Sequence, residues 1–392
     1  MIYKSPYPWF GGKSRVAPVV WRRFGKVQSF VDPFFGSLAM LLGRPEPWSG
    51  AETVNDADGF LCNFWRAVQA DPEDVAKHAD WPVNENDLHA RHIWLVSHKD
   101  SIVAQLEGDP DWCDPKVAGW WVWGQCSWIG GGWCSGRGPW RVVEGADGVP
   151  RLARSGDDDD DGEGDGGDGV WRQRPHLTGR GEMGIKRQRV HLLSSKGIKR
   201  QRVHLGNDGR GVNRQLVHLG DAGQSDINGN AGDGSCGLHD WMLSLSDRLR
   251  RVRVCCGDWS RVCGPTVLLP VNTDRFINVG VFLDPPYSDL ANRDKDIYSE
   301  DSQSVAHDVR KWAIEWGEDP RLRIVLCGYE GEHAMPDSWD KVEWKTGGGY
   351  GRISRTGDNA NARRERLWFS PHCLHPSKSR PVQGKLFDFS GV

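Results

Sequence analysis

A short apolar run in the last third of the chain, Val281-Phe282-Leu283, stops at Asp284-Pro285-Pro286-Tyr287. Two successive prolines end ladder pairing and restrict the backbone before them, so the run predicts a strand with a fixed end. In an open α/β sheet, ligands bind at the carboxyl ends of the strands. This end offers a carboxylate, carbonyls outside regular structure and an aromatic ring, which together suit a planar base with an amino group. Taken alone, the same residues are also typical of a turn after a buried strand.

The first 70 residues alternate strand, turn and helix. We expect a helix at 16–24, a strand at 27–31 that ends in Asp32-Pro33-Phe34-Phe35-Gly36-Ser37, and a helix at 38–42. A strand at 52–54 ends in Asn55-Asp56, and apolar residues then recur at helical spacing from Phe60 to Val68. Later we expect order at 238–254, a strand at 278–283, a helix at 304–316, and strands at 323–327 and 366–369. This alternation favours a parallel sheet in an α/β fold.

A long insertion separates the two parts of the predicted sheet. Residues 81–140 are helical in pattern and then rich in Trp and Gly, and such an aromatic segment either packs a core or stacks bases. We favour the core. Residues 144–169 are rich in Gly and Asp, and we expect them to be disordered or weakly ordered.

The net charge of −3 hides a segregation of charge along the chain. Residues 156–168 carry acids and no base, whereas 170–219 carry Lys and Arg against only Glu182 and Asp208. The basic segment contains four similar copies, at 170–177, 185–192, 198–205 and 212–219, whose alternation of apolar and polar residues suits short strands. Their cations could contact DNA phosphates or form a plain solvated surface, and a metal site at the recurrent His176, His191, His204 and His218 is a weaker alternative.

Cysteine usage and hydropathy bear on the compartment. The ten cysteines form no CxxC pair, which indicates a reduced protein without a standard zinc site. No apolar stretch reaches membrane-spanning length, and the start lacks the apolar core of a signal peptide. We therefore expect a soluble, cytoplasmic protein with a buried core.

Three further segments place polar chemistry in glycine loops or at predicted strand ends. They are Trp9-Phe10-Gly11-Gly12-Lys13, Asp32 to Ser37, and Asn55-Asp56. Glycines let backbone approach a ligand closely, and an acid after the second strand is where such folds bind ribose hydroxyls. In this order, these segments and Asp284 to Tyr287 resemble the Dam-like α group of DNA adenine methyltransferases.

The resemblance implies a Rossmann-like doubly wound fold that uses S-adenosylmethionine and double-stranded DNA and requires no metal. It implies a catalytic domain at 1–70 and 271–392, and a target-recognition region at 71–270 that contains the acidic linker 144–169 and basic, β-rich repeats 170–220. The implied cofactor contacts are Trp9, Gly11, Gly12, Lys13, Asp32, Pro33, Phe34, Gly36, Ser37, Asp56 and Asp284, and the implied catalytic residues are Asp284, Pro285, Pro286 and Tyr287. For DNA contacts we expect Arg187, Arg189, Arg200, Arg202, Arg214 and Arg352.

One departure from the family pattern affects the cofactor loop. Many relatives have a second glycine shortly after the position of Gly36, whereas here Leu38 and Ala39 follow Ser37. The resemblance also leaves alternatives open: cytosine N4 in DNA or adenine in RNA as the target, or an inactive nucleic-acid-binding relative. A monomer and a weak dimer both remain open, and a prokaryotic or phage origin, with or without a restriction partner, fits this family.

Deletion of residues 170–220 should weaken DNA binding and flatten its salt dependence. Each phosphate contact contributes about −0.9 to the slope of log K against log salt, so losing several contacts reduces the slope by several units. Titration of a DNA duplex at several salt concentrations measures this. An unchanged slope would refute a DNA-binding role for the repeats.

Overall fold

The computed structural model describes residues 3–9, 11–48, 50–128, 132–134, 140–145, 148–154, 237–269, 277–286, 305–344 and 365–375. The basic repeats and most of the acidic linker lie outside these ranges, so their predictions are untested. No helix in the described ranges is both long enough and apolar enough to cross a membrane.

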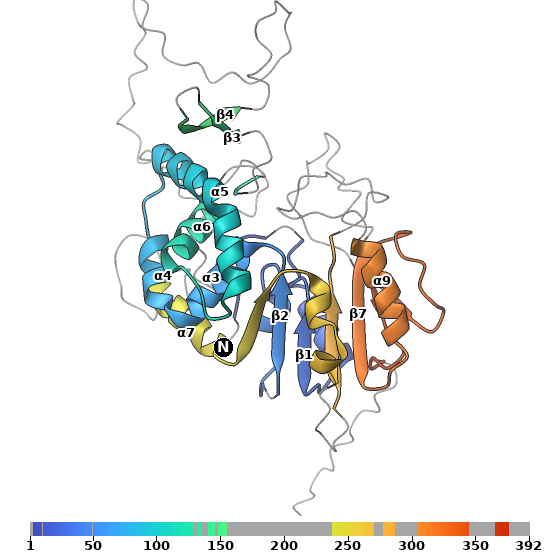
Figure 1. Cartoon of the computed structure of the whole chain (residues 1–392). Helices are drawn as coiled ribbons and strands as arrows, with labels where there is room; N and C mark the ends of the chain where they lie inside the picture. Colours follow the sequence, from blue (N-terminus) through green and yellow to red (C-terminus); the bar gives the residue numbers. More distant parts are fainter. Residues whose placement is uncertain are drawn as a thin grey trace, which may run out of the picture.

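Seven of the described strands form one sheet in the order β5-β2-β1-β6-β7-β9-β8. The bounds are β1 Ser29–Asp32, β2 Glu52–Asp56, β5 Val252–Cys256, β6 Val279–Leu283, β7 Leu322–Tyr329, β8 Asp340–Glu343 and β9 Glu365–Phe369. The neighbours from β5 to β7 pair in parallel, and β9 runs antiparallel to both β7 and β8. The predicted α/β fold with a mostly parallel sheet is confirmed (Figure 1).

The central strands are buried over most of their length because both faces of the sheet are covered. Side chains alternate between the two faces, so Phe282 joins one hydrophobic cluster while Val281 and Leu283 join the other. Helices α1 (Ala17–Phe24) and α3 (Gly59–Ala70) contribute to the first cluster. The second cluster receives side chains from η3 (Trp259–Val262), α8 (Pro265–Leu268) and α9 (Val305–Trp316).

The described part of the insertion is mainly helical. Helices α4 (Pro72–Ala79), α5 (Glu85–Gly108), α6 (Pro115–Ser127) and α7 (Leu238–Leu249) gather beside α3, next to the β2 side of the sheet (Figure 1). Trp121 and Trp123 of α6 are buried, so these members of the tryptophan-rich segment form core, as we favoured. The short α2 (Ala39–Leu42) follows β1, where a helix was predicted.

Two boundaries differ from the sequence predictions. Strand β5 pairs with β2 over its whole length, although the boundary at 270 assigned it to the insertion. The sheet therefore resumes near residue 252. The sequence did not predict this strand, because β5 is an edge strand with a short alternating pattern rather than a fully apolar run. Pairing with β3 (Trp140–Glu144) also orders β4 (Pro150–Arg154), inside the segment that we expected to be weakly ordered.

A buried ion triad links the insertion to the sheet. Glu52, at the start of β2, accepts hydrogen bonds from Arg44 at 2.8 Å and from two guanidinium nitrogens of Arg248, each at 2.8 Å. Arg248 comes from α7, and it also donates to the Leu41 carbonyl at 3.0 Å. All three charged side chains are buried. The returning end of the insertion is thereby fixed to the sheet.

Arg248→Met should destabilise the protein by about 3 kcal/mol, because it removes one partner from a buried ion cluster while keeping most of the side-chain volume. Urea unfolding followed by circular dichroism measures the change. As a control, Lys77→Ala breaks an exposed ion pair with Asp74 and should cost less than about 1 kcal/mol. Equal effects of the two substitutions would contradict a stabilising role for the triad.

Candidate active site

The order of the strands reverses between β1 and β6. From β1 the chain moves outward through β2 to β5, then returns to β6 on the other side of β1 and continues to β7. Such a switch point opens a crevice at the carboxyl ends of the strands. Asp32 ends β1, Asp56 ends β2, and Asp284 directly follows β6. The three predicted carboxylates therefore lie along one edge of the sheet, on both sides of the switch point.

An ion pair brings the N-terminal loop to this edge. The Lys13 ammonium lies 2.8 Å from the Asp284 carboxylate and donates to the Gly11 carbonyl at 2.9 Å. Lys13 is buried, with 7 % of its surface exposed. The Lys13 carbonyl accepts hydrogen bonds from the Val16 and Ala17 amides, which ties the loop to the start of α1. Two motifs from opposite ends of the chain thus meet through their charged groups.

Burial changes the pKa values of two carboxyl groups at this edge. Burial raises the pKa of Asp284, and the Lys13 ammonium opposes that shift. Burial also raises the pKa of Asp32 well above its usual range, and the negative charge of Asp284 raises it further. Perturbed carboxyl groups at a crevice are typical of functional sites.

The loop after β1 bends around a single glycine. Gly36 has a φ of +46°, and a Cβ added there would lie 2.5 Å from the indole nitrogen of Trp9. The Trp9 ring therefore lies directly against this backbone, and the Gly12 amide donates to the Trp9 carbonyl at 3.2 Å. Ser37 follows Gly36 and is buried. The two predicted glycine loops form one continuous surface.

Leu38 occupies the part of the loop where many relatives have glycine. Its φ of 59° and ψ of 16° are left-handed, a conformation that glycine adopts far more readily than leucine. The Leu38 side chain is fully buried in the core. Burial of that side chain holds the backbone in the shape that glycine would favour, so the departure in sequence preserves a glycine-like backbone at this residue.

Asp56 fixes the same loop from the second strand. Its carboxylate accepts hydrogen bonds from the Gly36 amide at 3.0 Å and from the Asp58 amide at 3.0 Å. Burial raises the pKa of Asp56 to about 7, and these amide hydrogen bonds oppose the shift. A carboxylate has about four acceptor positions, so further acceptor capacity remains at Asp56.

The remaining predicted residues follow the same edge. The Pro33 carbonyl accepts a hydrogen bond from Asn55 at 3.2 Å, and the Phe34 amide approaches the Asp32 carboxylate at 3.4 Å. Pro285 is buried and Pro286 is half-buried after β6. Tyr287 lies outside the described residues, as do Arg187, Arg189, Arg200, Arg202, Arg214 and Arg352.

Sequence reasoning missed three residues at this edge. Asp258 and Trp259 follow β5, and the Trp259 ring stacks on Phe34 with centroids 6.2 Å apart. Their signal was a polar residue after a short strand, as at Asp32 and Asp56. Glu365 begins β9 opposite Tyr329 at the end of β7, and no local pattern marks it, because the antiparallel direction of β9 brings it to the edge. Burial raises the pKa of Glu365, and Lys13 opposes that shift.

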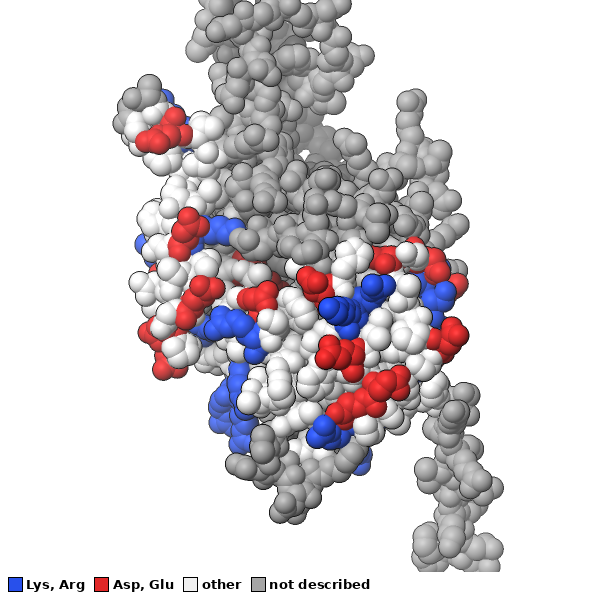
Figure 2. Space-filling model, turned by 45° about the vertical axis from the view of Figure 1, so that its right-hand side comes forward, with Lys and Arg blue, Asp and Glu red and all other residues white. Residues whose placement is uncertain are grey.

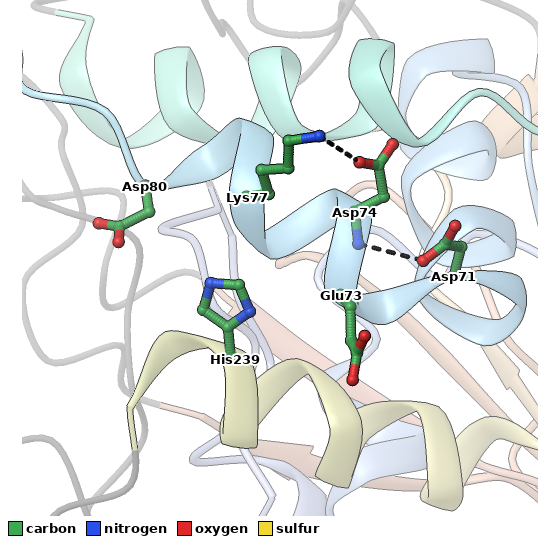
Figure 3. A pocket seen from close by; sticks show the side chains of 6 residues that line it. All are labelled: Asp71, Glu73, Asp74, Lys77, Asp80 and His239. Atoms are coloured by element: carbon green, nitrogen blue, oxygen red, sulfur yellow. Dashed lines mark hydrogen bonds and ion pairs between the residues drawn. The ribbon is translucent and has the colours of Figure 1, made fainter.

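A surface pocket of about 510 Å³ lies elsewhere, between α4 and α7 (Figure 3). Its lining residues are Asp71, Glu73, Asp74, Lys77, Asp80 and His239. Asp71 caps α4 by accepting from the Asp74 amide at 3.1 Å, and Asp74 pairs with Lys77. The pocket contains none of the predicted site residues, and these acids have local structural roles, so it is not the candidate site.

Comparison with known protein families finds a match for the N-terminal part of the chain. Residues 9–98 match the family model described as D12 class N6 adenine-specific DNA methyltransferase. The match includes Trp9 to Lys13, Asp32 to Ser37 and Asp56, and it ends within α5 before Asp284. A search of curated proteins found no match.

As the pH rises from about 4 to about 7 in the absence of ligand, Asp56 should contribute a decrease in the free energy of unfolding. The folded Asp56 carboxyl holds its proton up to a pKa of about 7, whereas an unfolded Asp loses its proton near pH ~4. The folded state therefore binds more protons in this window, and each such group removes up to ~1.4 kcal/mol per pH unit. Asp32 and Asp284 act in the same direction.

Asp56→Asn removes one of these titrations, so urea unfolding at the two pH values should show a weaker pH dependence for the variant than for the wild type. Identical pH dependences would contradict the raised pKa of Asp56.

Proposed function

We propose that this chain, whose residues 9–98 match the D12 class of N6 adenine-specific DNA methyltransferases, transfers the methyl group of S-adenosylmethionine to the exocyclic amino group of adenine in DNA. The observation that carries the assignment to this site is the Lys13–Asp284 ion pair at the switch point. It joins the matched N-terminal segment to the Asp-Pro-Pro segment that the match does not reach.

The residues present fit S-adenosylmethionine, which supplies an electrophilic methyl group when bound. Gly36 has no side chain where a Cβ would collide with Trp9, so the Trp9 ring can lie directly on the loop backbone that we assign to the cofactor. The unused acceptor capacity of Asp56 suits the hydroxyls of a ribose. We assign cofactor contacts to Trp9, Gly11, Gly12, Lys13, Asp32, Pro33, Phe34, Gly36, Ser37, Asp56 and Asp284.

Asp284 and the Pro285 carbonyl would receive the target amino group. The lone pair of that nitrogen is delocalised into the adenine ring, and hydrogen bonds to two acceptors favour a pyramidal nitrogen that can attack. The cofactor would supply its methyl group to this nitrogen while the sulfur keeps the electron pair of the broken sulfur–carbon bond, and the proton that the amino group loses would pass to water. An ionised Asp284 is the stronger acceptor, and Lys13 stabilises its charge against the burial that raises its pKa. Tyr287 would stack on the base.

The substrate is proposed to be double-stranded DNA whose target base flips out of the helix, at a cost of a few kcal/mol. On the face in Figure 2, the described surface interleaves Lys and Arg with Asp and Glu. Phosphate contacts are therefore proposed for the basic repeats, with Arg187, Arg189, Arg200, Arg202 and Arg214, and for Arg352. The target-recognition role of the insertion and a cytoplasmic location belong to the same proposal.

The purified protein should transfer labelled methyl groups from S-adenosylmethionine to unmodified DNA. Digestion of the product to nucleosides separates N6-methyladenine from N4-methylcytosine, and parallel assays with RNA test the remaining alternative. Binding to duplex DNA without any transfer would establish the inactive relative instead.

Asp284→Asn should reduce methyl transfer by at least about 10²-fold to 10³-fold, because it removes a preorganised polar contact to the reacting nitrogen. Cofactor affinity should stay within about three-fold of the wild type, since most contacts to the cofactor remain. Single-turnover transfer rates and calorimetric titration with S-adenosylmethionine measure the two quantities.

Asp74→Asn is the matched control, because it removes the same charge from the exposed surface between α4 and α7. It should leave both quantities unchanged. Loss of cofactor binding and transfer together in Asp284→Asn would count against the role assigned to Asp284.

A further inference from the structure

The Gly36 peptide is held from both sides. Its amide donates to Asp56 at 3.0 Å, and its carbonyl accepts a hydrogen bond from the Tyr7 hydroxyl at 3.1 Å. Tyr7 lies two residues before Trp9, whose indole covers the same glycine. Gly36, whose φ of +46° is left-handed, is thus held at its amide by Asp56, at its carbonyl by Tyr7 and on the side without a Cβ by Trp9.

The Tyr7 hydroxyl is itself fixed as a donor toward Gly36. The Gly36 carbonyl accepts the hydroxyl proton, and the Trp65 indole of α3 separately donates to the Tyr7 oxygen at 2.9 Å. Only 3 % of the surface of Tyr7 is exposed. Burial raises the pKa of the phenol well above its usual value, so the group keeps its proton.

An aromatic enclosure prevents the Tyr7 ring from moving independently. Its centroid lies 5.1 Å from that of Trp121, 5.5 Å from Phe64 and 5.9 Å from Trp9. Trp121 belongs to α6, and the same helix contacts the loop again through Gln125, which donates to the Pro8 carbonyl at 3.3 Å. The inserted helix therefore supports the segment that carries Tyr7.

We propose that Tyr7 is a positioning residue for the cofactor loop, acting through the Gly36 carbonyl to keep the Gly36 peptide in its bound shape before S-adenosylmethionine arrives. This rests on the proposed function of the site. Preorganisation lowers the ordering cost of binding, so loss of the hydroxyl weakens cofactor affinity more than it slows the transfer step.

The test compares two conservative variants of the full chain. Tyr7→Phe removes only the hydroxyl and keeps the ring. Trp65→Phe removes the other hydrogen bond of Tyr7 and leaves the Tyr7–Gly36 contact in place. Calorimetric titration with S-adenosylmethionine, steady-state kinetics and thermal unfolding are measured for both variants and the wild type.

Tyr7→Phe should raise the Kd and KM for S-adenosylmethionine about ten-fold, equivalent to ~1.4 kcal/mol, with kcat within about two-fold of the wild type. Trp65→Phe should lower the melting temperature but change the Kd by less than about two-fold. An unchanged Kd in Tyr7→Phe overturns the proposal. Equal Kd increases in both variants also overturn it, because Tyr7 would then act only through general stability.

Hydrogen exchange on the wild type tests the same proposal if Tyr7→Phe does not fold. The Gly36 amide should exchange as slowly in the free protein as the amides of β1, because its loop is already ordered. Exchange at the rate of an unprotected amide would overturn the proposal. Failure of the wild type to bind S-adenosylmethionine would instead reject the proposed function, so the two failures are distinguishable.

Discussion

The buried ion pair between Lys13 and Asp284 sets the geometry of the whole site. The two residues lie far apart in sequence, and only a parallel sheet with its switch point between β1 and β6 brings their segments together. The pair also stabilises the charge of a carboxylate whose pKa burial raises. Once Lys13 is placed there, the preceding residues have little freedom, and Trp9 comes to lie on Gly36. The ion pair and the contacts of Tyr7 together fix the position of the N-terminal loop.

Much of the fold could be predicted from sequence because its strands are apolar runs with abrupt polar ends. Strands β1, β2, β6, β7 and β9 and helices α1, α3 and α9 lie where periodicity placed them, within a few residues. Strand β8, Asp340–Glu343, carried no such signal, since it is a short edge strand with half of its residues exposed. It is a strand because β9 pairs with it, and pairing between distant segments is not encoded in local pattern.

The residues of the candidate site also divide into those that the sequence predicts and those that only the fold reveals. Asp32, Asp56 and Asp284 could be found because each follows an apolar run, and Gly36 because a glycine after a strand is a local signal. Tyr7 and Glu365 could not, because each reaches the site through tertiary contacts: one through Trp65 and Gly36, the other through the reversed direction of β9. Their residue types are ordinary in a core or on a strand, so only the fold reveals their neighbours.

The contacts of α6 show that the insertion is not an independent module attached to a finished sheet. Trp121 packs on Tyr7, and the Trp121 and Trp9 rings lie 6.5 Å apart. The tryptophan-rich segment therefore serves as core and, through the same side chains, as support for the loop after β1. At the other end of the insertion, Arg248 binds Glu52 at the start of β2. Through α6 and α7, the insertion is therefore fixed to the segment that carries Tyr7 and Trp9 and to the start of β2.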